Sequence, residues 1–237
     1  MLNTDILGQI RNLTFKNHST TLGPTLTFIN LPDYVLCTDI TLVSSNFTNV
    51  YPSKIGVMWN SLVNFSNFSI TNFQGRGFFE VQYYSELNLE NISVTNFIFW
   101  NQGKGCFLFI GSQSVVSATG LKFENIVTNN SLIYVDNSNM TLEEISLNQI
   151  QLTNDTKDGC YLYLDSSSIV NINNMQVNSF INQLIFQQTA YLTINNSTID
   201  NDCDNSPYLS MLYAYNLAQI IINNSVISNQ IYKSGVF

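Results

Sequence analysis

The chain has 237 residues, of which 45% are hydrophobic, 13% are aromatic and only 10% are charged. Disorder is excluded, because disordered segments combine high charge with few aromatic residues. The formal net charge of −8 argues against nucleic acid as a partner, because phosphate binding needs a basic surface.

Neither a membrane span nor a leader is evident in the sequence. No apolar run reaches the 18 or so residues that a spanning helix needs. The first residues, MLNTDILGQIRNL, lack the basic start and apolar centre of a signal peptide. Asparagine is the outlier in composition, with 34 of 237 residues, which suggests that the fold uses this side chain repeatedly.

A short pattern built around Asn recurs along the whole chain, as in ENISVTNF at residues 90–97. The interval between successive copies varies from 19 to 34 residues, so we expect a constant core unit joined by loops of variable length. Aligned on the first Asn of the pattern, the column reads Asn12, Ser44, Asn67, Asn91, Asn125, Glu144, Asn174, Asn196 and Asn224.

Other columns support this repeat. The residue two places before the column is apolar in all nine copies. Five places after it, a second polar column reads Asn17, Asn49, Asn72, Asn96, Asn130, Gln149, Ser179, Asn201 and Asn229. Within each unit apolar and polar residues alternate with a period of two, which indicates β-strands. A further apolar run lies upstream, as in GVMW at residue 56 and GCYLYL at residue 159. Three short strands per unit predict one coil of a parallel β-helix.

This pattern resembles the right-handed parallel β-helix of the pectate-lyase-like superfamily. The resemblance implies an all-β solenoid of about eight to nine coils with an Asn ladder at a tight bend. The Asn-rich composition also resembles that of large surface proteins of protists. The expected ladder has its side chains inside the coil and contains Asn12, Asn67, Asn91, Asn125, Asn174, Asn196 and Asn224.

Residues 1–237 are expected to form a single β-helix domain that is a segment of a longer solenoid. Both ends break off within the repeat, and solenoids need polar caps. Further copies, or other parts of the same protein, are therefore the predicted partners at the open ends.

Twelve Asn-x-Ser/Thr sequons occur in the sequence. Four of them begin in the ladder column, where an inward side chain could not carry a sugar. N-linked glycans are therefore expected at the sequons in outward or loop positions, which are Asn64, Asn139, Asn154, Asn195 and Asn223.

The four cysteines allow secretion without requiring it. Cys106 and Cys160 occupy the same column with one coil between them, about 9.6 Å apart, which is too far for a disulfide. A pairing of Cys160 with Cys203 stays open, as does the alternative that Cys37, Cys106 and Cys160 are small buried apolar residues.

No catalytic constellation is evident, and we expect neither an enzyme nor a cofactor. His18 is the single histidine, and Arg11 and Arg76 are the only arginines. Glu90, Glu124 and Glu143 are predicted to line up in three consecutive coils, which we interpret as a solvated face rather than a calcium stripe. An acidic series at 200, 202 and 204 lacks the later ligands of a calcium loop, so no metal site is predicted.

The sequence therefore favours a non-enzymatic structural segment of a large extracellular or cell-surface glycoprotein that forms a filament or coat. The alternative is a carbohydrate-binding or adhesive β-helix, or a degenerate polysaccharide lyase. Exposed aromatic residues in a row would favour binding, because aromatic rings stack on sugars. The candidates for that role are Trp59, Tyr83, Tyr84 and Trp100.

Overall fold

The structure is a computed structural model. It describes residues 8–11, 14–16, 26–29, 35–38, 41–43, 46–47, 56–75, 78–99, 107–152, 160–181, 183–200 and 212–228. All of its regular elements are β-strands. The described residues contain no helix of the length and hydrophobicity that a membrane crossing requires.

The strands become longest in the middle of the chain. The first are β1 (Gly8–Arg11), β2 (Thr14–Lys16), β3 (Leu26–Ile29), β4 (Val35–Thr38), β5 (Thr41–Val43), β6 (Asn46–Phe47) and β7 (Gly56–Trp59). The middle ones are β8 (Leu62–Gly75), β9 (Phe79–Gln82), β10 (Glu86–Phe99), β11 (Leu108–Ile110), β12 (Val115–Thr128), β13 (Ile133–Asp136) and β14 (Asn139–Leu152). The last are β15 (Cys160–Asp165), β16 (Ile169–Ile181), β17 (Gln183–Gln188), β18 (Tyr191–Asn195), β19 (Thr198–Asp200), β20 (Leu212–Tyr215), β21 (Gln219–Asn223) and β22 (Val226–Ser228).

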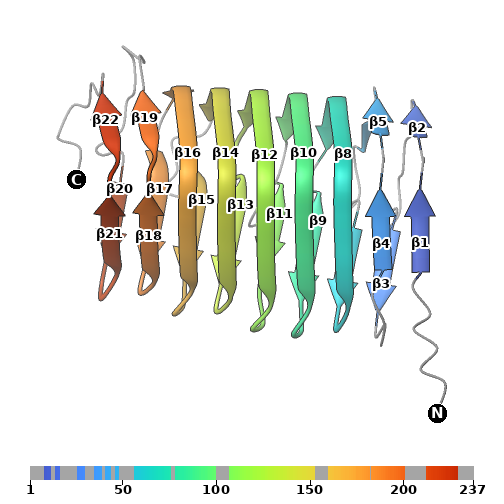
Figure 1. Ribbon diagram of the computed structural model, residues 1–237, viewed down its shortest axis with the longest axis horizontal. Helices are drawn as coiled ribbons and strands as arrows, with labels where there is room; N and C mark the ends of the chain where they lie inside the picture. The colour runs from blue at the N-terminus through green and yellow to red at the C-terminus, as the bar shows by residue number, and fades with distance from the viewer. Residues whose placement is uncertain are drawn as a thin grey trace.

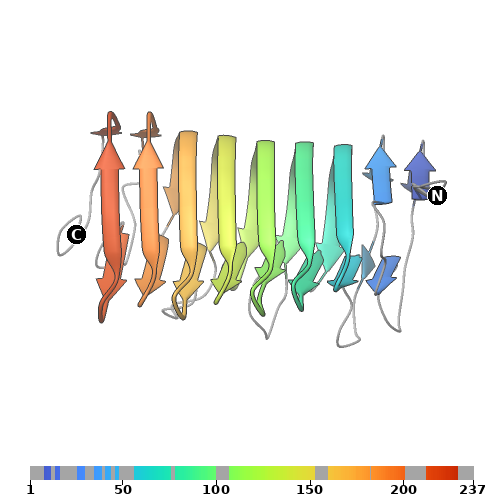
Figure 2. The same ribbon diagram turned by 60° about the horizontal axis from the view of Figure 1, so that its bottom comes forward.

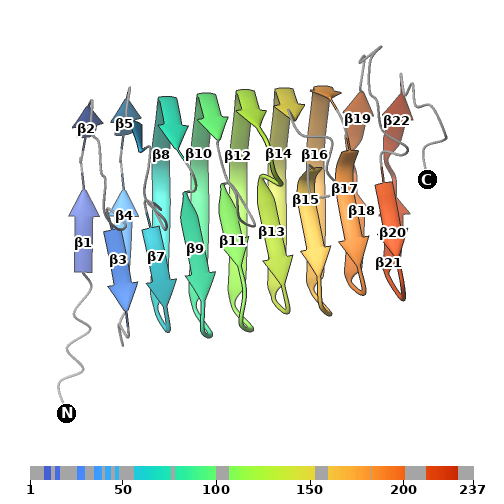
Figure 3. The same cartoon turned by 180° about the vertical axis from the view of Figure 1, so that it is seen from behind.

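The strands pair in parallel into a 14-stranded and an 8-stranded sheet. The larger sheet runs in the order β1-β4-β8-β10-β12-β14-β16-β18-β21, and each step along it is one coil (Figure 1). The smaller sheet, β3-β7-β9-β11-β13-β15-β17-β20, lies on the other side of the molecule (Figure 3). Seen obliquely, each coil leaves one sheet, turns and joins the other (Figure 2). The predicted all-β parallel solenoid is therefore confirmed.

Alternation along the strands of the larger sheet puts one side of each strand in the interior, whereas β13 and β15 of the smaller sheet are buried on both sides. In β12 exposed and buried residues alternate up to Gly120, and the alternation resumes out of phase at Leu121. The interior is apolar and rich in Phe, with the Phe78 and Phe107 rings stacked at 5.6 Å and the Phe107 and Phe123 rings meeting edge to face at 4.9 Å. Burial of aromatic area contributes most to the stability of such a core.

The long strands of the larger sheet bend at two corners, and both corners use left-handed backbone. The first corner has φ between 48° and 70° at Asn67, Asn91, Gly120, Glu144, Asn174, Asn196 and Asn224. The second corner has φ of 53° or 54° at Asn72, Asn96, Asn125 and Gln149. Asn and Gly tolerate this conformation better than other residues do, which explains why Asn recurs there.

The pairing register corrects the predicted alignment of two units. Ile92 pairs with Leu121, so Gly120 faces Asn91 at the first corner, and Asn125 faces Asn96 at the second. Asn125 therefore belongs to a different column from Asn91. Near the start of the chain Cys37, not Leu42, pairs with Phe65, which contradicts the predicted alignment of the unit that contains Leu42. Asn12 and Ser44 themselves lie outside the described residues.

The ladder side chains are on the outside of the coil, not inside it. Asn67, Asn91 and Asn96 are exposed. The Asn91 amide donates to Oδ1 of Asn67 at 3.4 Å, and the Asn96 amide donates to Oδ1 of Asn72 at 3.0 Å. Asn125 continues the second column by donating to Oδ1 of Asn96 at 2.6 Å. The hydrogen-bonded ladder is therefore present, but the expectation of inward side chains was wrong.

A buried serine column at a third corner was not predicted. This corner joins the smaller sheet to the larger one. The backbone N–H of Ser85 donates to Oγ of Ser114 at 3.2 Å, and the N–H of Ser114 donates to Oγ of Ser138 at the same distance. The column contains Ser61, Ser85, Ser114, Ser138 and Ser168, each six residues before its first-corner residue. The sequence therefore contained this signal, at a fixed spacing.

Candidate functional site

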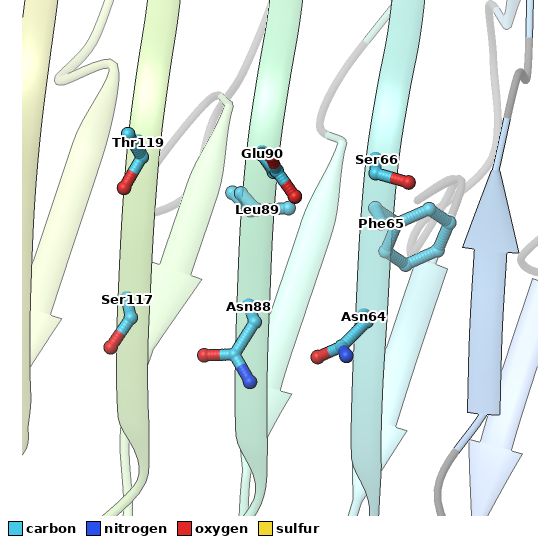
Figure 4. Close-up of a pocket in the computed structure, with 8 residues that line it drawn as sticks. All are labelled: Asn64, Phe65, Ser66, Asn88, Leu89, Glu90, Ser117 and Thr119. Atoms are coloured by element: carbon cyan, nitrogen blue, oxygen red, sulfur yellow. The ribbon is translucent and has the colours of Figure 1, made fainter.

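A shallow groove crosses three neighbouring coils on the outer face of the larger sheet. It has a volume of about 300 Å³. Its lining comes from β8, β10 and β12, which lie side by side (Figure 4). The residues are Asn64, Phe65, Ser66, Asn88, Leu89, Glu90, Ser117 and Thr119. Phe65 and Leu89 are themselves buried, so the polar side chains of the other six define its chemistry.

Parallel pairing brings these six side chains together. Asn88 pairs with Asn64 on one side and with Ser117 on the other. Glu90 in the same way lies between Ser66 and Thr119. Each set forms a row across the strands, about 4.8 Å from coil to coil, and the two rows are two residues apart on one face. The groove therefore presents amides, hydroxyls and one carboxylate in a regular grid.

One acceptor in the groove lacks a hydrogen bond. Oδ1 of Asn64 is shielded from solvent and has no partner. The amide of Asn88 donates to Oε1 of Glu86 at 3.2 Å. A shielded acceptor without a donor costs free energy that a ligand hydroxyl or N–H would recover. The groove can therefore bind a polar neutral molecule through several hydrogen bonds.

Three exposed aromatic residues lie at the third corner, just before the groove strands begin. Trp59 is 40% exposed, Tyr83 is 52% exposed and Tyr84 is 71% exposed. The Trp59 and Tyr83 rings meet edge to face, with centroids 5.8 Å apart. Trp59 precedes Asn64 by five residues and Tyr84 precedes Asn88 by four. The aromatic corner and the groove thus belong to adjoining segments of the same coils.

The two tyrosines occupy strained backbone. Tyr83 and Tyr84 have φ of 55° and 60°, a region that bulky residues rarely adopt. At the same corner other coils place small or polar residues in this conformation, namely Asn60, Ser112, Gln113, Asn137, Ser166, Ser167, Thr189 and Asn216. Two Tyr residues at a position that suits Asn, with both rings in solvent, favour a role in binding over a role in folding.

A second aromatic stack runs along the outer face of the smaller sheet. Phe109 stacks on Tyr134 at 5.6 Å, and Tyr134 stacks on Tyr163 at 4.7 Å. The Tyr134 hydroxyl donates to Oδ2 of Asp165 at 2.8 Å. Burial, followed by this hydrogen bond and the charge of Asp165, raises the pKa of Tyr134 well above its ordinary value. Tyr134 is only 3% exposed, so this stack stabilises the coils and offers little binding surface.

The predicted acidic row is not continuous. Glu90 and Glu143 share a column but are separated by Thr119, and Glu124 lies in another column between Thr95 and Asn148. Glu143 accepts a hydrogen bond from the Asn174 amide. Among the residues that the structure describes, no three His, Cys, Asp or Glu side chains are grouped so as to hold a metal ion.

The sequon residues fall into several environments. Asn139 is exposed at the start of β14, and Asn64 lines the groove. Asn195 and Asn223 belong to a further amide row, in which Asn195 donates to Asn173 at 2.8 Å and Asn223 donates to Asn195 at 2.9 Å.

Asn154 lies outside the described residues, as do Trp100, His18, Cys106 and Cys203. Cys160 is buried in β15, and its pairing with Cys203 stays a prediction.

The groove was not predicted because its residues are 24 to 29 positions apart in neighbouring units and become neighbours only through the register. All four aromatic candidates were named from the sequence, and the three that the structure describes, Trp59, Tyr83 and Tyr84, are exposed, which distinguishes them from core residues. The sequence matches no known family model, and a comparison with curated proteins finds no match either. Of the predicted resemblance to the pectate-lyase-like superfamily, the structure therefore supports the parallel β-solenoid fold and not membership of that superfamily.

Proposed function

We propose that this chain is a non-enzymatic structural segment of a large extracellular or cell-surface glycoprotein, of the pectate-lyase-like β-helix type, that assembles into a filament or coat. The observation that supports this proposal is the continuity of the cross-coil contacts. Three kinds of contact link neighbouring coils. These are the amide rows on the outside, the serine hydroxyls at the third corner and the aromatic stacks. A solenoid held together in this way is a stiff rod whose length scales with the number of coils.

The coil formed by β21 and β22, the last that the structure describes, is the place where we propose that a further copy adds. Ile220, Ile222 and Ile227 pack against the core but are only partly buried. Strands β21 and β22 each pair on one side only within the described residues (Figure 1). Unpaired strand edges accept further parallel strands through their backbone groups. A second copy of the chain, adding its own coil at this edge, would cover these isoleucines and continue the rows of Asn and Ser.

Assembly is tested by a charge at the edge strand. Val226, on β22, is 59% exposed, and Val226→Lys places a lysine beside the edge, a feature that blocks strand addition in natural sheets. Val115→Lys is the matched control, because Val115 is 41% exposed on a middle coil. We expect wild type and V115K to form rods longer than one chain by electron microscopy and sedimentation, and V226K to remain short. Single short rods for wild type at every concentration would refute assembly.

Carbohydrate binding is a second candidate, favoured by the aromatic corner beside the polar groove. Sugars present apolar ring faces to aromatic side chains and hydroxyls to amides and carboxylates. The groove contains one carboxylate and no cationic side chain, which favours a neutral saccharide over an acidic one.

The test is titration calorimetry with neutral oligosaccharides of glucose, galactose and N-acetylglucosamine. The double variant Tyr83→Asn/Tyr84→Asn replaces both rings by the residue type that Asn60 and Asn137 supply in other coils. We expect at least a tenfold loss of affinity with a stable fold. Tyr191→Asn, at a residue that is 50% exposed elsewhere on the larger sheet, is the control. Binding that survives the double variant would exclude the corner as the site.

A further inference from the structure

Asn139 is a sequon residue in an unusual environment. It is the first residue of β14, and its backbone is fixed because its N–H donates to the Ser114 carbonyl at 3.1 Å. Its side chain is exposed, and within the described contacts its amide makes no hydrogen bond. Thr141, the third residue of the sequon, is exposed on the same face of the strand, as a separation of two residues requires. Both recognition groups of the sequon therefore face solvent.

The neighbours of Asn139 across the sheet are apolar and exposed. The register pairs Asn139 with Val115 on one side and with Ile169 on the other. Val115 is 41% exposed and Ile169 is 45% exposed. The next residue in this row, Tyr191, is 50% exposed. Single exposed apolar residues are common, but here two of them flank one unbonded amide at about 4.8 Å on each side.

Three other described sequon residues, Asn91, Asn195 and Asn196, differ from this arrangement. The Asn195 amide donates to Asn173 and its carbonyl accepts from Asn223, so a sugar on Asn195 would replace an N–H of an existing amide row. The Asn91 amide donates to Asn67. Asn196 lies at the first corner, where the pairing places Asn174 and Asn224 on its two sides, so amides flank it instead of apolar groups.

We infer that Asn139 is an N-glycosylation site whose first N-acetylhexosamine lies across Val115 and Ile169. This inference rests on the proposed passage of the protein through a secretory compartment. A polyprenyl-diphosphate-linked oligosaccharide is the donor. Its C1–O bond to the diphosphate breaks, a bond forms between C1 and Nδ2 of Asn139, and the amide proton and the diphosphate leave. The apolar face of the sugar ring then removes the two apolar side chains from water.

Occupancy is measured on the full chain secreted from eukaryotic cells. Enzymatic deglycosylation in heavy-oxygen water, followed by peptide mass spectrometry, marks each modified Asn. We expect Asn139 to be modified in most molecules, and Asn139→Gln and Thr141→Ala each to lose the same single glycan. An unmodified Asn139 in a chain with glycans elsewhere would overturn this inference alone. Native protein without any glycan would instead contradict the proposed glycoprotein function.

The packing of the sugar is tested by a double-mutant cycle on the secreted protein. Removing the glycan with N139Q should lower the melting temperature by about 1–3 °C, because a buried apolar contact is lost. In the Val115→Ser/Ile169→Ser background the same N139Q change should have no effect, because the surface under the sugar is gone. An equal effect of N139Q in both backgrounds would show that the sugar does not lie on these residues.

Discussion

The buried hydroxyl of Tyr161 has no hydrogen-bond partner in the interior. Tyr161 is fully buried, its hydroxyl has no partner, and burial raises the pKa of this group. Tyr161→Phe removes the unpaired hydroxyl and should raise the free energy of unfolding by about 1 kcal/mol, measured by urea denaturation. Tyr134→Phe is the matched control, and its effect should have the opposite sign. It removes the hydrogen bond to Asp165, so the free energy of unfolding should fall by about 1 kcal/mol.

The same two tyrosines predict a loss of stability at alkaline pH. An unfolded tyrosine ionises near about pH 10, whereas both folded groups have a raised pKa and stay protonated. Their contribution is therefore fully present below about pH 10 and is lost as the pH rises, at up to about 1.4 kcal/mol per pH unit for each tyrosine. Urea denaturation between about pH 9 and 11 should show this slope, and the double Phe variant should show a smaller one. Equal slopes for both proteins would contradict the prediction.

Gly120 is the first-corner residue that carries no side chain. Its φ is 70°, and a Cβ placed on it would lie 3.0 Å from Oδ1 of Asn91. Gly120→Ala should therefore cost about 1–2 kcal/mol in unfolding free energy. Gly120→Asn should cost less, because Asn tolerates left-handed backbone and offers an amide to the ladder. Equal losses for both variants would show that contact with Asn91, and not backbone conformation, dominates.

At the scale of the coil, the serine column has a defined role. Ser114 accepts a hydrogen bond from the backbone of Ser85 and is buried. Ser114→Ala leaves that N–H without its acceptor, which should cost about 1–3 kcal/mol in urea denaturation. Thr119→Ala, at an exposed position on β12, the strand that follows Ser114, should change stability by less than about 0.5 kcal/mol. A neutral S114A variant would mean that another acceptor replaces the serine.

Strand alternation and left-handed corners made the fold class predictable from the sequence, because both depend on local backbone preference. The corner assignment failed between Asn91 and Asn125, because both corners use Asn and one first-corner position is Gly120. The residue three places after Asn67 and Asn91 is apolar, whereas Thr128, three places after Asn125, is polar, and this difference already indicated the error. Asn72 and Asn96 were assigned to the correct second column because Asn67 and Asn91, five residues earlier, are first-corner residues as predicted.

At the scale of the whole molecule, surface chemistry was less predictable than architecture. The aromatic residues Trp59, Tyr83 and Tyr84 could be named, but their exposure depends on the backbone at the third corner. The exposed pair beside Asn139 joins residues of β12 and β16, which only the register connects. Neighbours in adjacent coils are far apart in the sequence. Because the loops between them vary in length, residue spacing alone does not predict which residues are neighbours.

The two similar corners of each coil have a consequence for how the chain folds. A coil that adds to the growing end can place Asn125 against Asn96 or, displaced by five residues, against Asn91. Either choice forms an amide pair, so the ladder cannot distinguish them. Only the first alignment brings the Ser114 hydroxyl to the backbone N–H of Ser85 and places Gly120, which has no side chain, opposite Asn91. These two residues therefore favour the correct register of the β12 coil, and we expect a chain without them to populate misaligned states that interconvert slowly.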